Sequence, residues 1–501
     1  MEIIAIIDTK SGKVQGYSDN GIEVYKGIPF AEPPIGDLRF QPPIAKAPWD
    51  GVLDATKYGP CSFQGATQLE EWFGKLEPES EDCLTLNIWT PAADGDKRPV
   101  MFWIHGGAFI MGGGTHEFYD GLNLAKRGNV VVVTINYRLG ALGFLYIPDK
   151  TINAGILDQA LALNWVHNNI KKFGGDPDNI TIFGESAGGY SVLTLPVIPQ
   201  VKGQIRRVIA QSAPAIDPEI SDKNTKGFMR KLKVKKGDIE SLRNIPPEEI
   251  IKAQNEFMGS DPNNILAFRP LIDGDTIPKH PLNAFRDGDL KDIDFLIGTN
   301  LDEAKLFTYL DPGFNEMVKT GGENAVLGLL AMSGVDPNES KEILETYKSA
   351  RKGKLSIKPM DLLDAVVTDA MFRIPTIRFL EAHSKYQPNT FNYMFTFPCP
   401  QFDGALGCPH AIDIPFVFNT LNAPGIPEFV GNGPDINNLS EKVMDAWIAF
   451  AHTGNPNHKN LPEWSPYDTK TRTTMMLGEE IKVSNKVFDK EREAWEGLLE
   501  I

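Results

Sequence analysis

The stretch 179–193 reads NITIFGESAGGYSVL and contains the pattern G-x-S-x-G around Ser186. The residues at 179–183 are typical of a buried strand, and those after Gly188 are typical of the start of a helix. Glycines two residues before and two residues after the serine permit a turn too sharp for larger side chains. A strand, a tight turn and a helix in this order present a serine hydroxyl as a nucleophile at the edge of a sheet. The alternative is a glycine-rich turn with an incidental serine.

Other short apolar runs, rich in β-branched residues and without polar alternation, predict further buried strands. They lie at 100–104, 130–135, 180–183, 208–211, 295–298 and 390–397. A helical pattern over 154–173 lies between two of these runs and ends at a Gly-Gly-Asp-Pro sequence. Alternating strands and helices predict an α/β fold with a large, mostly parallel central sheet flanked by helices.

Two charged, mainly helical regions, at about 217–283 and 310–386, interrupt this alternation after predicted strands. Insertions at the carboxyl edge of a parallel sheet commonly cover a ligand pocket. No internal repeat, low-complexity tract or linker rich in proline and serine divides the sequence. We therefore expect residues 1–501 to form one domain, with the two helical insertions over the candidate site.

A second glycine-rich motif, HGGAF at 105–109, directly follows the predicted strand 100–104. A carbonyl group attacked by a serine becomes an oxyanion, which needs hydrogen-bond donors that are already in place. Loops of this type supply backbone N–H groups in lipases and esterases. Gly107 and Ala108, with Ala187 after the serine, are the candidate donors. A phosphate-binding loop is the alternative, but the glycines at 112–114 are followed by no P-loop lysine, and GxGxxG is absent.

A nucleophilic serine also needs an orienting acid and a base, which follow it along the chain in that order. Four of the eight histidines come late enough, namely His383, His410, His452 and His458. Only His410 follows a predicted strand through a loop rich in Gly and Pro, which makes it the candidate base, and the alternative is a loop histidine with a structural role. Asp302 and Glu303 both follow the predicted strand 295–298, and the residues alone do not decide which of them is the acid.

The composition excludes several other functions. The 501 residues include 50 Lys and Arg against 66 Asp and Glu, a net charge of −16. Duplex DNA needs a basic face, so no nucleic-acid partner is expected, and the densest basic stretch, 229–236, predicts a solvated face. No stretch is apolar enough for a membrane span, and the N-terminus lacks the features of a signal peptide. We therefore expect a cytoplasmic protein, or a secreted one if a leader was removed.

Nine blocks along the chain follow one another in an order found in a known family. They are YKGIPFA at 25–31, EDCLTLN at 81–87, HGGAF at 105–109, NYRL at 136–139, GILDQ at 155–159, FGGDP at 173–177, GESAGG at 184–189, GTNLDE at 298–303 and HAIDIPF at 410–416. With these blocks the chain resembles the type-B carboxylesterase family, which includes cholinesterases and bacterial p-nitrobenzyl-type esterases. The resemblance extends over about 16–476.

The resemblance implies an α/β-hydrolase fold and a serine carboxylesterase that hydrolyses carboxylic esters through an acyl-enzyme. In its motifs Ser186 is the nucleophile, His410 the base and Glu303, rather than Asp302, the acid. Its oxyanion donors and supporting serine correspond to Gly107, Ala108, Ala187 and Ser212. No metal or cofactor is implied. We expect small-molecule esters with short-to-medium acyl chains as substrates, broad specificity, and a monomer or weak homo-oligomer.

The four cysteines form two pairs along the sequence. Cys61 and Cys83 match a pair that is joined by a disulfide near the pocket mouth in secreted members of the family. A bond between Cys399 and Cys408, before His410, is a second and weaker hypothesis. Both bonds therefore remain open at this stage.

The substrate is less well defined. Trp72 and Phe73 lie where cholinesterase-like members carry a tryptophan for a quaternary ammonium, but recognition of that group uses an aromatic cage, and the alternative is rings packed within a loop. Phe109, Phe307 and the aromatic residues at 391–397 are candidates for an acyl pocket. The same chemistry could also cleave amides, carbamates or long-chain lipids. An inactive binding protein of the same fold is the competing function, yet such relatives typically lack the nucleophile or the base.

Overall fold

The structure is a computed structural model that describes residues 2–65, 76, 78–148, 152–220, 222–261 and 264–498. In these residues twelve strands form one sheet, and three short strands, β2 (Ile7–Asp8), β3 (Lys13–Gln15) and β6 (Val52–Asp54), form another. The strands of the large sheet are, in spatial order, β1 (Glu2–Ile3), β4 (Tyr17–Asp19), β5 (Ile22–Pro29), β7 (Thr85–Thr90), β9 (Val131–Ile135), β8 (Arg98–Ile104), β10 (Gly175–Glu185), β11 (Arg207–Gln211), β12 (Asp294–Asn300), β13 (Thr390–Phe395), β14 (Thr473–Leu477) and β15 (Lys482–Asn485).

The middle of the large sheet is parallel, and its two edges are antiparallel. All pairings from β9 through β8 to β14 are parallel, whereas β1, β4, β5, β7 and β15 pair antiparallel with their neighbours. All the predicted strands lie in the parallel part, which confirms the large, mostly parallel sheet. The antiparallel edge strands were not predicted; β5 and β7, for example, mix polar and apolar residues instead of forming a continuous apolar run.

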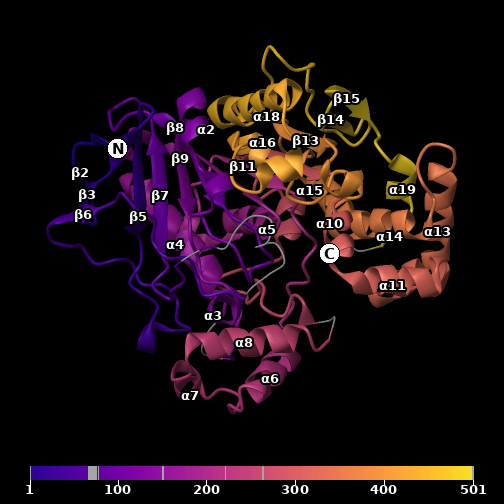
Figure 1. The fold of residues 1–501 in the computed structure, drawn as a ribbon, viewed down its shortest axis with the longest axis horizontal. Helices are drawn as coiled ribbons and strands as arrows, with labels where there is room; N and C mark the ends of the chain where they lie inside the picture. The colour runs from indigo at the N-terminus through magenta and orange to yellow at the C-terminus, as the bar shows by residue number, and fades with distance from the viewer. Residues whose placement is uncertain are drawn as a thin grey trace.

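Both faces of the parallel strands are buried. Along β8, Val100, Phe102 and Ile104 belong to one hydrophobic cluster, and Met101 and Trp103 belong to another, because successive side chains of a strand point to opposite faces. The first face is covered by α4 (Ala154–Asn169) and α5 (Ala187–Thr194), and the second by α18 (Pro434–Thr453), as the core residues of the two clusters show. Figure 1 shows α18 and α4 on opposite sides of the strands.

The helix predicted over 154–173 is α4, followed by the short helix η3 (Ile170–Phe173). Of the apolar residues that recur every fourth position in this helix, Leu157 and Leu161 are only partly buried, whereas Trp165 is buried. Ile156, Leu163 and Val166 are completely buried. A helix with buried residues on most sides gives a weak 3.6-residue signal, so a spacing of four residues does not identify its core face.

The predicted insertions consist mainly of helices. The first contains α6 (Asp222–Lys231), α7 (Ile239–Arg243), α8 (Pro247–Met258) and α9 (Pro281–Arg286). The second contains α11 (Pro312–Gly321), α12 (Glu323–Met332), α13 (Pro337–Arg351), α14 (Pro359–Thr368), the π-helical turn η7 (Asp369–Arg373) and α15 (Ile374–His383). Figure 1 shows α6, α7 and α8 as one group and α11, α13 and α14 as another. The single domain stays a prediction.

The remaining described helices connect strands or cover the sheet. They are α2 (Leu122–Gly128), α3 (Gly140–Phe144), α10 (Ala304–Leu310), α16 (Ile414–Phe418), α17 (Ile426–Val430) and α19 (Asp489–Glu493), with the short turns η1 (Gly36–Leu38), η2 (Glu117–Tyr119), η4 (Leu195–Val197), η5 (Pro199–Val201) and η8 (Gln401–Gly404). No helix in the described part of the chain is long and apolar enough to cross a membrane. The basic stretch 229–236 has its charged residues exposed, as predicted.

Candidate active site

Ser186 stands alone between the last residue of β10 and the first residue of α5. Its backbone has φ 56° and ψ −122°, a conformation that L residues rarely adopt and that functional sites often store. The strained residue of the turn is therefore the serine itself. Gly188 is needed for close packing, because a Cβ there would lie 2.0 Å from the Ile104 carbonyl oxygen.

Glu303 and His410 are brought together at the carboxyl edge of the sheet. Oε2 of Glu303 lies 2.6 Å from Nδ1 of His410, and both side chains are buried. Glu303 follows β12, and His410 lies in the loop beyond β13, the neighbouring parallel strand. A carboxylate on Nδ1 fixes the tautomer whose Nε2 can accept a proton, which is what a catalytic base requires.

The other candidates are engaged elsewhere. Asp302 accepts from the Cys408 N–H at 2.9 Å and pairs with Lys305 at 3.0 Å. The ring nitrogens of His383 contact the Thr390 hydroxyl and the Leu290 carbonyl, far from Ser186 in the fold. In the same way, His452 and His458 contact the backbone carbonyl oxygens of Gly128 and Lys442, respectively.

Two groups hold the second oxygen of Glu303. The Ser212 hydroxyl donates to Oε1 at 2.5 Å, and the Asn300 N–H donates to the same oxygen at 2.6 Å. Hydrogen bonds to the ionised form of a buried carboxyl favour that form, so they oppose the cost of its burial. Ser212 thus contacts the candidate acid, and the supporting role that the family resemblance implies for it stays a prediction.

Glu185 is a site residue that the sequence analysis quoted within GESAG but gave no role. Its Oε1 lies 3.0 Å from Nε2 of His410. Burial raises the pKa of Glu185 to about 8, an effect that the positive charge of His410 opposes. Burial alone would lower the pKa of His410, but the charges of Glu185 and Glu303 outweigh it and raise that pKa to about 9.

Asp413 is a further buried carboxyl beneath the histidine. It accepts hydrogen bonds from Gln211 at 2.8 Å and Tyr393 at 3.0 Å. Its burial raises its pKa, which these donors oppose. Asp413 comes three residues after His410 in the block HAIDIPF, and this position was the only signal in the sequence.

The three predicted oxyanion donors face the same cavity as Ser186. Within the described residues, the N–H groups of Gly107, Ala108 and Ala187 donate no hydrogen bond to the protein, so they can serve a ligand. Gly107 has φ 104°, and a Cβ there would lie 2.1 Å from the Met111 carbonyl oxygen. The neighbouring Gly106 also lacks room for a side chain, because a Cβ there would lie 2.9 Å from Cβ of Ser186.

A cavity of about 700 Å³ contains Ser186 and His410. Most of its described lining is apolar, from residues such as Leu306, Phe314 and Phe429. The acidic residues of the described lining are Glu79, Glu185 and Asp311; Glu185 faces His410, and the described lining contains no Lys or Arg. The cavity therefore suits a largely apolar ligand without negative charge.

The aromatic predictions have mixed outcomes. Phe109 and Phe307 line the cavity, as expected. The aromatic side chains at 391–397 are buried in the core around β13 and do not line it, because a central strand has both faces covered. Trp72 and Phe73 lie outside the described residues.

Neither of the two disulfides that the sequence left open is formed. All four cysteines are buried thiols, and burial raises the pKa of Cys83 well above its ordinary value. Cys408 donates its thiol to the Phe395 carbonyl at 3.1 Å, and Cys61 contacts the Pro78 carbonyl at 3.6 Å. Each of these two sulfurs therefore interacts with backbone rather than with the other cysteine of its proposed pair.

A family model described as the carboxylesterase family matches residues 4–495, nearly the whole sequence. The chain belongs to the carboxylesterase family. Among curated proteins, it is 35% identical over 498 residues to the para-nitrobenzyl esterase of Bacillus subtilis, with 97% of this chain and 98% of that protein covered. It is likewise 35% identical over 492 residues to the phenmedipham hydrolase of Pseudarthrobacter oxydans, with 95% of each chain covered.

Solved structures of carboxylesterases agree with this assignment. A PNB esterase structure superimposes with a TM-score of 0.86 at 34% identity, over 98% of this chain and 99% of that one. A Geobacillus stearothermophilus carboxylesterase gives a TM-score of 0.85 at 36% identity, over 98% of this chain and 100% of that one. The predicted α/β-hydrolase fold is thus confirmed, and the protein is a carboxylic ester hydrolase.

Proposed function

We propose that this carboxylesterase uses Ser186 as nucleophile, His410 as base and Glu303 as orienting acid, on neutral, largely apolar esters. The observation that carries the proposal is the 2.6 Å contact between two buried side chains, Glu303 and His410, at the cavity that Ser186 lines. Catalytic hydrogen bonds are often long or misaligned before substrate binds, so a contact between Ser186 and His410 is expected to tighten in the complex.

The reaction follows from this arrangement. Nε2 of His410 takes the hydroxyl proton as Oγ of Ser186 bonds to the ester carbonyl carbon, and the carbonyl oxygen becomes an oxyanion. The N–H groups of Gly107, Ala108 and Ala187 donate to that oxyanion. The carbon–oxygen bond to the leaving group then breaks, and His410 returns its proton to the departing alkoxide. Water, deprotonated by the same nitrogen, then attacks the acyl carbon. The bond from that carbon to Oγ of Ser186 breaks, His410 returns the proton to Oγ, and the carboxylic acid leaves.

The cavity supports a range of substrate sizes. Its volume of about 700 Å³ lies within the range of pockets for drug-sized ligands. Short-to-medium acyl chains, with either aliphatic or aromatic alcohols, therefore have room in it. The carboxyl groups of Glu79 and Asp311 in its lining disfavour esters that also carry an ionised carboxylate.

We also propose that the enzyme acts as a monomer or weak homo-oligomer in the cytoplasm. The thiol state of its four cysteines supports a reducing compartment. Light scattering coupled to size exclusion tests the first statement. Alkylation of the unfolded, unreduced protein tests the thiol state on which the proposed compartment rests. Four modified cysteines are expected, and two or none would contradict it.

The catalytic assignment is tested with Ser186→Ala on p-nitrophenyl butyrate. We expect kcat to fall by about 10⁴-fold or more, as when a serine nucleophile is removed. The control is Ser191→Ala, a buried serine in the same helix α5 that does not line the cavity. Near wild-type turnover of Ser186→Ala, with Ser191→Ala unchanged, would remove Ser186 from the mechanism.

A further inference from the structure

The turn η7 (Asp369–Arg373) interrupts what would otherwise be one long helix from α14 into α15. The Ile374 N–H donates to the carbonyl oxygen of Asp369, five residues back, which is the hydrogen bond of a π-helix. Single π-helical turns are rare and are frequent at functional sites. In this chain the residues around the π-helical turn make two sets of contacts. One set faces the candidate active site, and the other faces away from it.

On the first side, the segment contacts the base and the residue that follows the acid. The hydroxyl of Thr368 accepts from the N–H of Ala304, the residue after Glu303, at 3.1 Å. The ring of Phe372 packs against the His410 imidazole, with the two centroids 4.9 Å apart and the planes tilted by 43°. Phe372 also lines the cavity and is almost completely buried.

The same turn touches the loop that supports the acid. The carbonyl oxygen of Met371 accepts from the N–H of Ala215 at 2.6 Å, three residues after Ser212. Met371 lines the cavity as well. The turn therefore contacts the segments that carry Ser212, Glu303 and His410, although none of its residues takes part in the proposed chemistry.

On the other side, a buried ion pair closes the turn. Arg373 donates two hydrogen bonds to the carboxylate of Asp369, each 2.5 Å long, from Nε and Nη2. The hydroxyl of Tyr347, from α13, donates to the same carboxylate and accepts from Nε1 of Trp495 at 2.7 Å. None of these four side chains is more than slightly exposed. A bidentate pair of this kind fixes geometry as well as charge.

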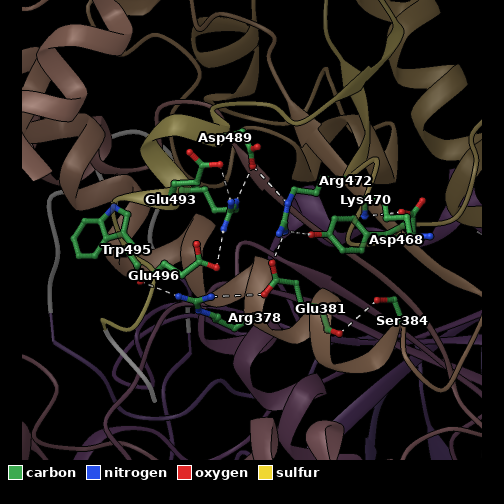
Figure 2. A network of polar contacts seen from close by, with 12 residues as sticks. Arg378, Glu381, Ser384, Asp468, Lys470, Arg472, Asp489, Glu493, Trp495 and Glu496 are labelled. Atoms are coloured by element: carbon green, nitrogen blue, oxygen red, sulfur yellow. Dashed lines mark hydrogen bonds and ion pairs between the residues drawn. The ribbon is translucent and has the colours of Figure 1, made fainter.

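The C-terminal residues complete the cluster. Oε1 of Glu491, in α19, accepts from Arg351 at 2.7 Å, and its Oε2 lies 3.9 Å from Nη2 of Arg373. The backbone of the same segment is held by Arg378 of α15, which donates to the Trp495 carbonyl at 2.8 Å (Figure 2). The C-terminal segment is thus attached to α13, to α15 and to the turn between α14 and α15.

A second set of ion pairs holds the outer side of this segment. Asp489 pairs with Arg492 at 2.7 Å and with Arg472 at 3.5 Å. Arg378 and Arg472 both pair with Glu381 of α15, as Figure 2 shows. These pairs are more exposed than the Asp369 pair and contribute little stability individually. They keep the segment in place against α15.

A buried ion pair is a poor way to gain stability, since well-packed apolar residues often stabilise as much. Its bidentate geometry does specify one arrangement of the turn between α14 and α15. We propose that the Asp369–Arg373 pair, closed by Tyr347 and Glu491, is a positioning device for the catalytic base and acid. It holds Phe372 against His410 and Thr368 against the backbone after Glu303. The proposal rests on the catalytic roles proposed above.

Two variants test the device in the full-length enzyme. Arg373→Lys keeps the charge and removes the paired donors, and Tyr347→Phe removes one hydroxyl with little change in volume. We expect each to lower kcat on p-nitrophenyl acetate by about 10-fold, because small misplacements of catalytic groups are costly. KM should change much less. The acidic limb of the pH profile of kcat/KM should also move, since His410, which faces Glu303, Glu185 and Asp413, would be held differently.

The matched control is Arg207→Lys. Arg207 is a buried arginine whose Nε lies 3.3 Å from Asp294, at the starts of β11 and β12 and therefore at the opposite edge of the sheet. The Arg207→Lys variant should have a lower Tm than the wild type, with unchanged kcat and pH profile. If Tyr347→Phe and a folded Arg373→Lys keep wild-type kcat and pH profile, or change them only as Arg207→Lys does, the positioning role is wrong.

The outcome is separable from that of the proposed function. A fluorophosphonate probe should label Ser186 in the wild-type enzyme. If it does not, the catalytic assignment fails first. If it does, and the variants turn over substrate as the wild type does, only the positioning device fails. A Tyr347→Phe variant that loses kcat at unchanged Tm supports the device even if Arg373→Lys does not fold.

Discussion

Oε2 of Glu303 lies 2.6 Å from Nδ1 of His410, and both side chains are almost inaccessible to solvent. The other oxygen of Glu303 is held by the Ser212 hydroxyl and the Asn300 N–H. These hydrogen bonds and the burial fix one orientation of the carboxylate. This fixes the ring of His410 with Nε2 at the cavity, as the proposed mechanism requires.

Glu303→Gln should lower kcat far more than Asp302→Asn. An amide at position 303 can offer its N–H₂ to Nδ1 and so favours the wrong tautomer of His410, which costs about 10⁴-fold in the comparable triad of a serine protease. Asp302 is partly exposed and contacts Lys305 and the Cys408 N–H, so its replacement should change kcat by less than about 10-fold. The kcat of each variant is measured on p-nitrophenyl butyrate. A larger loss of kcat in Asp302→Asn than in Glu303→Gln would make Asp302 the acid.

Glu185→Gln should shift the pH dependence of kcat/KM to lower pH. The base acts in its neutral form, so activity is lost as the pH falls through the pKa of His410, which nearby carboxylates raise to about 9. Removing the carboxylate 3.0 Å from Nε2 lowers that pKa, and the acidic limb should move down by about 1 pH unit. An acidic limb that is unchanged, or that moves to higher pH, would show that Glu185 does not raise the pKa of His410.

Gly106→Ala should reduce kcat, with a smaller effect on stability. A methyl group there would lie 2.8 Å from the Glu185 carbonyl oxygen and 2.9 Å from Cβ of Ser186, so the nucleophile or the oxyanion loop must move. A displacement of this size can cost about 100-fold in rate. Gly95→Ala is the control, because a Cβ at Gly95 meets nothing within 4 Å. Full activity of Gly106→Ala would contradict the close approach of the two loops.

The acidic lining predicts selectivity for substrate charge. For two p-nitrophenyl esters of equal length, one ending in trimethylammonium and one in carboxylate, kcat/KM should be higher for the cation by about 10-fold at low salt. Added salt should reduce the ratio. Asp311→Asn, which keeps an N-cap side chain at α11, should also reduce it, whereas Asp435→Asn, outside the cavity, should not. Equal kcat/KM values would show that the wall charges do not act on substrates.

Most of the parallel strands and the serine were predictable because each depends on residues close together in sequence, but β14, which pairs parallel with β13, was not predicted. Val100 to Ile104 and the strand before Ser186 are apolar runs, and the glycine motifs follow them directly. The acid was not predictable from local pattern. Asp302 and Glu303 are adjacent carboxylates after the same strand, and the turn after β12 decides which one points inward. Only the family resemblance favoured Glu303.

Residues that act through distant contacts gave no signal. Asp369 and Arg373 are four residues apart in a stretch that fits an ordinary charged helix, and only the fold brings Tyr347 and Glu491 to them. The same holds for Glu185, whose closeness to His410 spans 225 residues of sequence and depends on two neighbouring loops. Such contacts arise from tertiary packing, which sequence periodicity does not encode.

The central claim is that Ser186 is the nucleophile of a serine esterase, and the mass of the protein after reaction with a fluorophosphonate tests it most directly. The account predicts one adduct per chain, located on the peptide that contains Ser186 and absent from Ser186→Ala, with loss of esterase activity in proportion to labelling. An enzyme that hydrolyses p-nitrophenyl esters yet stays unlabelled, or carries the adduct on another residue, would contradict it.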